Sequence, residues 1–408
     1  MALIAHGKIR IELIALTGLF ILGIVGPSEP DVIFSGFGNP ALITITSVFI
    51  ISQGIIHSEA LRGLGQLIEQ KIANIRGQVI GVSLVSSFLS AFMNNVGAVG
   101  LLLPTVVRMS DRKQIDRGVF GLPLAFASVV GGSLTLIGSA PNIITASYMY
   151  SATGDSFRMF DFTYHGFAMV VTGLILWLIL SFFGYAGINH QVKNSKEQDT
   201  EHSKETPKHF SPLSTPTKKL TIFIVLVAVL TVSTGILHPG LGFGAAGLLL
   251  IFSGVLTPQD AYQSIDLKII FFLGSMLGIG EILEDTSSIE LLSNTLIDNL
   301  PEFSPAVLIL LLILISSALS NGINNSASAV FMAPIAVVFA EQTDLETAAS
   351  LMAVAAGSNL TLLLPTHQAV LMVQSKAPFS PRTFAKIGIL LTIVLSLVAA
   401  FVINLVWQ

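Results

Sequence analysis

Long apolar stretches make up most of the chain, and short polar connections separate them. Each continuous stretch is long enough, or nearly long enough, to cross a bilayer as a helix, because about 20 apolar residues span the hydrocarbon core and tilt or flanking residues make up small differences. The continuous stretches are residues 11–26, 41–56, 164–187, 220–237, 242–256, 267–280 and 387–405. This pattern predicts an all-α polytopic membrane protein.

Other apolar regions are interrupted by polar residues, glycine and proline. These regions are residues 77–107, 118–150, 305–340 and 347–375. An amide without a hydrogen-bond partner in hydrocarbon costs roughly 4–8 kcal/mol, and irregular backbone at membrane depth is tolerated only inside protein or beside a water-filled cavity. We therefore expect these regions to be re-entrant or broken helices that surround a polar site.

One interrupted pattern occurs twice. SSFLSAFMNNVGAVGLLLPTVV begins at Ser86, and SSALSNGINNSASAVFMAPIAVV begins at Ser316. The serines, an asparagine pair and a proline (Pro104 and Pro334) recur in both segments at one constant offset, without a gap. Polar centres at corresponding positions of two halves are typical of transporters with internal repeats, which bind substrate between the repeats.

The distribution of charge predicts the topology of each half. Segments 57–76 and 108–117 both carry several Lys and Arg residues, so both should be cytoplasmic by the positive-inside rule. Residues 77–107 between them must then enter and leave from the same side, as a re-entrant hairpin with Asn94 and Asn95 at its tip. The flanks of the matching hairpin carry acidic residues and no Lys or Arg, so they should lie outside.

We therefore expect two inverted repeats, each with a re-entrant hairpin and a broken transmembrane helix. Residues 1–187 form the first repeat with a cytoplasmic N-terminus, and residues 242–408 form the second with an external C-terminus. Residues 188–219 are polar and of mixed charge, with Pro, Ser and Thr, which predicts a flexible cytoplasmic linker. Residues 220–241 supply a connecting span that reverses the direction of the chain.

Composition agrees with a membrane protein and excludes several functions. Of 408 residues, 52% are hydrophobic and 11% are charged, whereas soluble domains carry about 25% charged residues. The absence of cysteine excludes disulfides and thiolate metal sites. The sequence has no enzyme or nucleotide-binding motif and no basic strip with aromatic residues. We expect a non-enzymatic, multi-pass protein of the bacterial inner membrane that does not bind nucleic acid.

Four polar clusters lie at apparent membrane depth. Two are the hairpin tips, and two are the broken segments GGSLTLIGSAPN, from Gly131, and GSNLTLLLPTHQ, from Gly357. A helix broken at this depth exposes backbone N–H groups, which suit an anion. It also exposes backbone C=O groups, which together with Asn and Ser oxygens suit a hard cation such as Na⁺. One such corner in each repeat would enclose a shared site for an anion and sodium.

Structural roles compete with each of these functional roles. A single Asn in a membrane helix more often only bonds a neighbouring helix, worth about 0.6–2 kcal/mol, but duplicated Asn pairs beside Gly/Pro breaks favour a site. Gly131 and Gly132 fit close helix packing as well as a break. His367 lies in a polar cluster, and a lone histidine is more often a hydrogen-bonded filler than a proton relay. No Lys, Arg, Asp or Glu falls at the predicted midplane, where a cation antiporter usually needs an acid.

The hairpin tips and broken helices resemble those of the divalent-anion:sodium symporter family, which carries dicarboxylates, citrate and sulfate. That family has a Ser-Asn-Thr motif at each tip and broken helices that end near G-T-P-P-N. The corresponding segments here are Asn94-Asn95-Val96, Asn324-Asn325-Ser326, Gly138-Ser139-Ala140-Pro141-Asn142 and Pro365-Thr366-His367-Gln368. The resemblance covers residues 9–406 and implies a homodimer whose transport unit moves like an elevator against a fixed scaffold.

The resemblance also implies roles for the residues that match these motifs. Sodium ions would be bound by Asn95 and Asn325, with help from Ser90, Ser320 and the backbone at Gly138. The substrate anion would be bound by Asn94, Asn324, Ser326, Ser139 and Thr366. Val96 lacks the hydroxyl of the first motif, and Asn replaces Ser at the first position of both motifs, which favours a smaller anion such as sulfate. His367 leaves room for proton coupling, because histidine titrates near neutral pH.

We therefore predict a secondary active transporter that imports a small divalent anion, sulfate or a di- or tricarboxylate, with sodium as the coupling ion. Alternatives from the same superfamily are a cation or metalloid-anion antiporter and a proton-coupled anion carrier. An alternative from a different class is a membrane sensor that binds its ligand without transporting it. A small anion and the lipid bilayer are the expected partners.

The inverted topology predicts opposite labelling of two engineered cysteines, since the chain has none of its own. With Thr286→Cys, an impermeant maleimide should label intact cells from outside. With Arg112→Cys, the same reagent should label only after the membrane is opened. The reverse pattern would contradict the assignment of sides.

Overall fold

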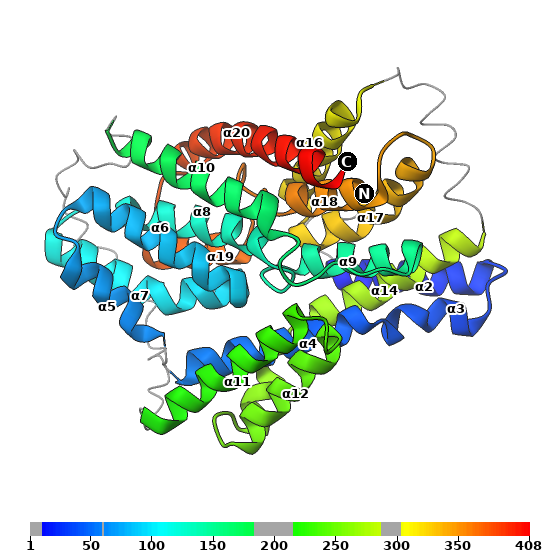
Figure 1. The fold of residues 1–408 in the computed structure, drawn as a ribbon, viewed down its shortest axis with the longest axis horizontal. Helices are drawn as coiled ribbons and strands as arrows, with labels where there is room; N and C mark the ends of the chain where they lie inside the picture. Colours follow the sequence, from blue (N-terminus) through cyan, green and yellow to red (C-terminus); the bar gives the residue numbers. More distant parts are fainter. Residues whose placement is uncertain (1–9, 59–60, 183–214, 287–302) are drawn as a thin grey trace.

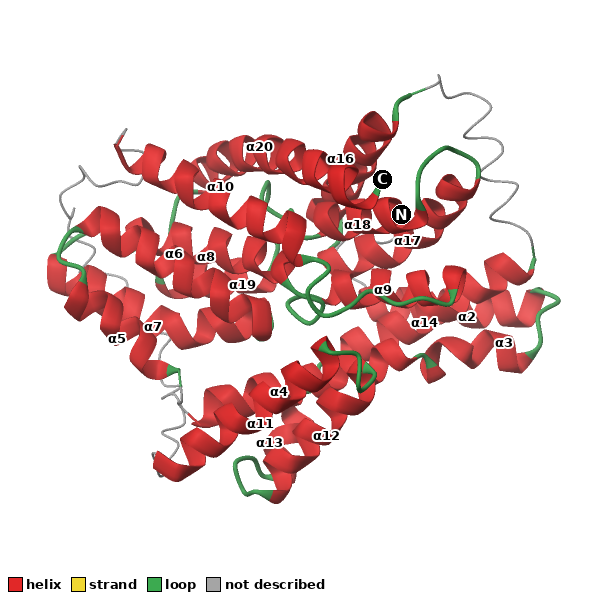
Figure 2. Ribbon diagram, in the orientation of Figure 1, coloured by secondary structure: helices red, strands yellow, loops and turns green. Residues whose placement is uncertain are grey.

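The computed structural model describes residues 10–58, 61–182, 215–286 and 303–408, and these residues form helices and loops without a β-strand (Figure 1, Figure 2). Within this part, 5 helices are long and apolar enough to cross a membrane. They are Pro30–Ser58, Ile75–Phe92, Thr163–Phe182, Pro305–Gly322 and Pro381–Trp407. The prediction of an all-α membrane fold is confirmed.

The first repeat contains both predicted irregular elements. Its helices are α2 (Ile11–Val25), α3 (Pro30–Phe34), η1 (Ser35–Gly38), α4 (Pro40–Ser58), α5 (Arg62–Lys71), α6 (Ile75–Phe92), α7 (Asn95–Lys113), α8 (Gly118–Gly131), η2 (Gly132–Leu134), α9 (Ala140–Thr153) and α10 (Thr163–Phe182). Helices α6 and α7 form the re-entrant hairpin, whose tip is the asparagine pair. Helices α8 and α9 form the broken helix, with η2 and an extended segment at the break.

The second repeat follows helix α11 (Thr215–Ser233) and has the same order of elements. Its helices are α12 (Pro239–Phe252), α13 (Pro258–Ser264), α14 (Leu267–Asp285), α16 (Pro305–Gly322), α17 (Asn325–Glu341), α18 (Thr347–Ser358), α19 (Gln368–Lys376) and α20 (Pro381–Trp407). Hairpin α16–α17 and broken helix α18–α19 match those of the first repeat. In Figure 1 hairpin α6–α7 reaches the centre from the left of the view and hairpin α16–α17 from the upper right.

The packing of the two repeats is also matched. Helix α6 packs on α8 as α16 packs on α18, and each hairpin's second helix packs on the other repeat's broken helix, α17 on α9 and α7 on α19. Helices α10 and α20 pack together across the repeats. There Phe126 of α8 stacks on Phe384 of α20, with 4.6 Å between ring centroids. Helices α6–α10 and α16–α20 therefore form one body, which we call the core unit.

Helix α5 packs on α6 and α7 of the core unit. The other helices, α2, α3, η1, α4 and α11–α14, form a second body, which we call the scaffold (Figure 1). Helices of the two repeats pack against each other in the scaffold, because α4 packs on α12 and α14 packs on α2 and η1. Segment 29–37 of the first repeat corresponds to segment 257–265 of the second, so α3–α4 and α13–α14 are equivalent. The core unit meets the scaffold mainly where α9 contacts α4 and α17 contacts α14.

Two details revise or resolve the sequence interpretation. Helix α11 begins at Thr215, so the last residues of the predicted linker 188–219 are helical, and residues 188–214 lie outside the described part. Proline at the second position of α11 suits a helical first turn, which is why a polar segment joins the span. Gly131 serves close packing, because an added β-carbon would lie 2.4 Å from Cα of Ser87 on α6. Gly132 is the first residue of η2, at the break.

Gly36 of η1 is expected to be required for the scaffold. A β-carbon there would lie 2.3 Å from the Gly274 carbonyl oxygen and 2.3 Å from the Gly278 nitrogen of α14, whereas Gly38 has open space around it. Gly36→Ala should therefore lower the free energy of unfolding by about 1–3 kcal/mol, as overpacking does. Thermal unfolding in detergent measures this effect, with Gly38→Ala as the matched control. Equal melting temperatures for the two variants would contradict the close contact.

Candidate functional site

The first asparagine of each pair caps a helix. Oδ1 of Asn94 accepts a hydrogen bond from the Gly97 backbone N–H at 2.7 Å, and Oδ1 of Asn324 accepts one from Ala327 at 2.7 Å. Asparagine is among the preferred N-cap residues, which explains why α7 and α17 start where they do. Each tip thus presents the partly positive N-terminus of a helix at the centre of the core unit.

The predicted sodium ligands of the first repeat lie together. Oγ of Ser90 is 2.6 Å from Oδ1 of Asn95 and 2.6 Å from the Ser128 carbonyl oxygen. A β-carbon added to Gly132 would lie 2.7 Å from the same Asn95 oxygen and 3.2 Å from the Gly138 carbonyl oxygen. Neutral oxygens from the first hairpin, from α8 and from the first break therefore lie around the Asn95 side chain. Such a donor set fits a hard cation like Na⁺.

Ser139, which was predicted to bind substrate, lies beside the predicted sodium ligands of the first repeat. Its Oγ is buried and has no hydrogen-bond partner among the described residues, and its Cβ lies beside Gly132. A buried hydroxyl without a partner is costly, so a bound ion or water would be favourable here. This observation agrees with an ion site at the first break.

In the second repeat, the corresponding serine and asparagine have different hydrogen-bond partners. Oγ of Ser320 contacts the Ser358 carbonyl oxygen at 2.6 Å and Oγ1 of Thr361 at 2.5 Å. Oδ1 of Asn325 accepts from the backbone N–H of Ser326 at 2.9 Å. Ser320 and Asn325 are therefore engaged with other partners, and Thr361 is the polar side chain that the sequence interpretation left without a role.

Unwound backbone in the second break is satisfied by one side chain. Asn321 donates to the carbonyl oxygens of Ser317 and Leu360, and its Oδ1 accepts from the backbone N–H groups of Leu363 and Leu364. All the hydrogen-bonding capacity of this amide is used by the protein. Asn321 thus holds the break open and has no capacity left for a ligand.

A second amide pair joins the two broken helices. Nδ2 of Asn359 donates to Oδ1 of Asn142 at 2.8 Å, and both side chains are buried. Asn142 in turn donates to the carbonyl oxygens of Gly132 and Thr135 at the first break. The sequence singled out both residues as polar cluster members, and the fold makes them one link between repeats.

His367 links the two hairpin tips. Its Nε2 lies 3.3 Å from Nδ2 of Asn95 and 3.4 Å from Nδ2 of Asn325. Its Nδ1 accepts from the backbone N–H of Ala369 at 3.1 Å, which makes His367 the N-cap of α19. A neutral ring that accepts at Nδ1 carries its proton on Nε2. Because the amide Nδ2 atoms are donors as well, Nε2 makes close contacts with the two tips and no hydrogen bonds to them. A second proton would remove this cap, so the protonation state of the ring is tied to the start of α19.

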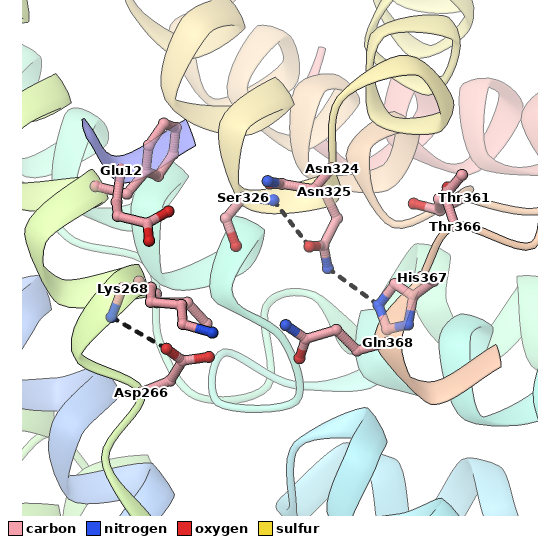
Figure 3. Close-up of a pocket in the computed structure, with 12 residues that line it drawn as sticks. Glu12, Asp266, Lys268, Asn324, Asn325, Ser326, Thr361, Thr366, His367 and Gln368 are labelled. Carbon is pink, nitrogen blue, oxygen red and sulfur yellow. Dashed lines mark hydrogen bonds between the residues drawn. The ribbon is translucent and has the colours of Figure 1, made fainter. Parts of the chain in front are cut away.

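A cavity of about 180 Å³ lies between the second hairpin tip, the second break and the scaffold (Figure 3). The core unit lines it with Asn324, Asn325, Ser326, Thr361, Thr366, His367 and Gln368, and the scaffold lines it with Glu12, Asp266, Lys268, Ile269 and Phe272. Three predicted substrate residues, Asn324, Ser326 and Thr366, thus meet in one cavity. The other two, Asn94 and Ser139, do not line it.

Charged side chains also line this cavity, although no Lys, Arg, Asp or Glu falls at the predicted midplane of the spans. Glu12, Asp266 and Lys268 all line it, and Glu12 is only 9% exposed. Asp266 and Lys268 lie at the start of α14 and Glu12 lies in the first turn of α2. Positions at the start of an apolar run look like membrane edges in the sequence, but the fold brings these two helix starts to the cavity. An acid within the run 11–26 was the signal that could have identified Glu12.

Known proteins resemble this chain in sequence. The model of the citrate transporter family matches residues 1–357. The uncharacterized transporter YfbS of Escherichia coli is 26% identical over 183 residues, which are 45% of this chain and 30% of that protein. Sodium/sulfate cotransporter 1 of Chlamydomonas reinhardtii is 24% identical over 156 residues, 36% of this chain and 18% of that protein. These matches span less than a third of either relative.

A solved structure resembles the fold. The crystal structure of the YdaH transporter from Alcanivorax borkumensis aligns with 97% of this chain and 96% of its own length, with a TM-score of 0.60 and 13% sequence identity. At this identity the likeness concerns the arrangement of helices alone.

Two substitutions of His367 separate its cap from its link between the tips. His367→Ala removes both, so the free energy of unfolding should fall by about 1 kcal/mol or more. His367→Asn keeps a side-chain oxygen that can cap α19 but is too short to contact Asn95 and Asn325 together. We expect this variant to melt like the wild type and to lose substrate uptake in proteoliposomes. Unimpaired uptake by His367→Asn would show that the link is dispensable.

Proposed function

Because the chain belongs to the citrate transporter family, we propose that it is a secondary active transporter that moves a small anion across the membrane together with sodium ions. The observation that carries this proposal is the cavity at the second hairpin tip. There two helix N-termini, hydroxyl groups and an ammonium group converge. This combination suits an anion, because each component offers positive charge or hydrogen-bond donors.

The substrate would bind between the tip of hairpin α16–α17 and the start of α19. Asn324, Ser326 and Thr366 supply an amide and two hydroxyl groups at this point. A volume of about 180 Å³ suits a small anion, since pockets for drug-sized ligands measure roughly 300–1,000 Å³. Sulfate and small di- or tricarboxylates such as succinate and citrate are the candidates we propose.

Sodium would bind next to the tips, at Ser90, Asn95 and Gly138 in the first repeat and at Ser320 and Asn325 in the second. The neutral oxygens of the first cluster, and the unpartnered Oγ of Ser139 beside them, support an ion there. A relative is named a sodium/sulfate cotransporter, which supports the choice of ion. Sodium at both tips would add the positive charge that a divalent anion needs.

Alternating access would come from movement of the core unit against the scaffold, in the manner of an elevator. The core unit is joined across the repeats by the Asn142–Asn359 and His367 contacts, which would let it move as one body. The cavity lies at its border with the scaffold, so a displacement would move the bound anion past fixed residues. A homodimer that holds the scaffold in place completes this proposal.

Two alternatives to sodium-coupled anion transport are each supported by one observation. A proton-coupled carrier is favoured by the position of His367 between Asn95 and Asn325. A cation antiporter is favoured by Glu12, the acid that such a protein needs near its site, although Lys268 in the same cavity offsets that charge. A static sensor would share the binding site but not the movement.

Uptake into proteoliposomes tests the proposal. Radiolabelled citrate, sulfate and succinate are supplied with and without an inward sodium gradient at fixed pH, and at least one should enter only with the gradient. Asn95→Ala and Asn325→Ala should each lower uptake about tenfold or more, because a polar contact to a charged ligand is worth about 1.5–3 kcal/mol. Uptake driven by a proton gradient alone would favour proton coupling, and no uptake under either gradient would favour the sensor or the antiporter.

Asn74→Ala is the matched control for these variants. Asn74 also caps a helix of the first hairpin, by accepting from the Gly77 N–H at 2.8 Å, but it lies at the opposite end of α6 from the tip. Its replacement should cost about as much stability as a lost cap, roughly 1 kcal/mol, and leave uptake unchanged. A loss of uptake in this variant would mean that the asparagine effects are structural.

A further inference from the structure

Lys268 brings an unpaired positive charge to the cavity. Its side chain is exposed, lines the cavity, and extends from α14 toward the side where Ser326 and Gln368 lie (Figure 3). Among the described side chains, no carboxylate forms an ion pair with its ammonium group. Its backbone N–H is capped by Oδ1 of Asp266 at 3.1 Å, so this carboxylate already has a structural role.

The charge balance of the cavity depends on this one side chain. Glu12 and Asp266 are its acids, Lys268 is its base, and His367 is its remaining titratable group. Without Lys268, the protein itself would offer an anion two carboxylates and only the partial charges of helix N-termini, each about half an elementary charge, and bound sodium would be the only full positive charge nearby. With Lys268, the cavity offers a full positive charge with three donors on the wall opposite Thr366 and the hairpin tip.

We propose that Lys268 is a substrate-binding residue contributed by the scaffold, and that it holds an anionic oxygen of the transported molecule in one orientation of the core unit only. The proposal rests on the proposed function and adds a specificity residue to it. The remaining polar contacts come from the tip of hairpin α16–α17 and the segment before α19, both in the core unit, whereas α14 packs on α2 and η1 of the scaffold. When the core unit moves, it carries the anion away from Lys268, and this contact is broken.

The inverted repeats define what the anion meets in the opposite orientation. The equivalent of α14 is α4, and the offset that aligns segment 29–37 with segment 257–265 also pairs Pro40 with Lys268. There Oδ1 of Asn39 caps α4 by accepting from the Ala41 N–H at 2.9 Å, and no ammonium group is present at the start of that helix. The anion should therefore bind more tightly in the orientation of the core unit that places it beside Lys268.

A charge-rescue experiment tests this inference, since the chain contains no cysteine. Lys268→Cys is purified, reconstituted, and assayed with radiolabelled citrate and sulfate added to each face of the vesicles. The KM should rise about tenfold or more, equivalent to about 1.4 kcal/mol, on one face, with little change on the other. Aminoethyl methanethiosulfonate, which restores an ammonium group, should recover the KM, and the sulfonatoethyl reagent should not. Recovery also shows that the variant is folded.

Lys386→Cys is the matched control, because Lys386 is an exposed lysine of α20 outside the cavity. It should keep the wild-type KM with either reagent. Glu12→Gln should have the opposite effect to Lys268→Cys and lower the KM several-fold, because it removes a like charge from the anion's surroundings. A rise in KM for Glu12→Gln would contradict the charge balance argued above.

The outcomes separate this inference from the proposed function. If the wild type transports and Lys268→Cys keeps its KM on both faces, Lys268 does not bind the substrate and the inference is overturned. An equal rise on both faces overturns the scaffold part, because the lysine would then stay with the anion throughout. If the wild type does not transport, the function fails, and thermal stabilisation of the detergent-solubilised protein by citrate decides the binding. Stabilisation that is equal in the wild type and Lys268→Cys overturns the inference.

Discussion

A backbone N–H or C=O at membrane depth must find a hydrogen-bond partner inside the protein, and the core unit depends on the side chains that meet this requirement. Asn321 satisfies four backbone groups around the second break, and Asn142 satisfies two carbonyl groups at the first. Asn94 and Asn324 do the same for helix starts. Much of the polarity that marks these segments is thus used to keep helices broken, and a ligand can use only the groups that remain.

The groups that remain are distributed unequally between two repeats of the same architecture. The second tip has Ser326 where the first has Val96, and the second break has Thr366 and His367 where the first has Ala140 and Pro141. The scaffold adds Lys268 on the same side. A symmetric frame thus holds an asymmetric cavity, while the oxygens around Asn95 remain better suited to an ion. We therefore propose that the anion binds at the second tip and that sodium binds beside Asn95 at the first.

The contacts between repeats explain why the core unit would behave as one body. Asn142 and Asn359 are bonded to each other at buried positions, where breaking the pair would leave amides without partners at a cost of about 1–3 kcal/mol each. His367 contacts both tips while it caps α19. The scaffold, by contrast, meets the core unit at a border that contains the cavity and charged side chains, and such a border can slide more readily than a packed core.

Elements whose cause is local or periodic could be predicted from the residues alone. Apolar length defines the spans, the constant offset between the two polar patterns defines the repeats, and Gly, Pro and Asn inside apolar runs define the hairpin tips and breaks. Which of these polar residues lie in one site depends on the packing of the folded chain. His367 meets Asn95 from the other half of the chain, and Lys268 and Glu12 reach the cavity because α2 and α14 start beside the core unit. No local pattern encodes such contacts, because they depend on how separate helices pack and not on the residues next to them in the chain.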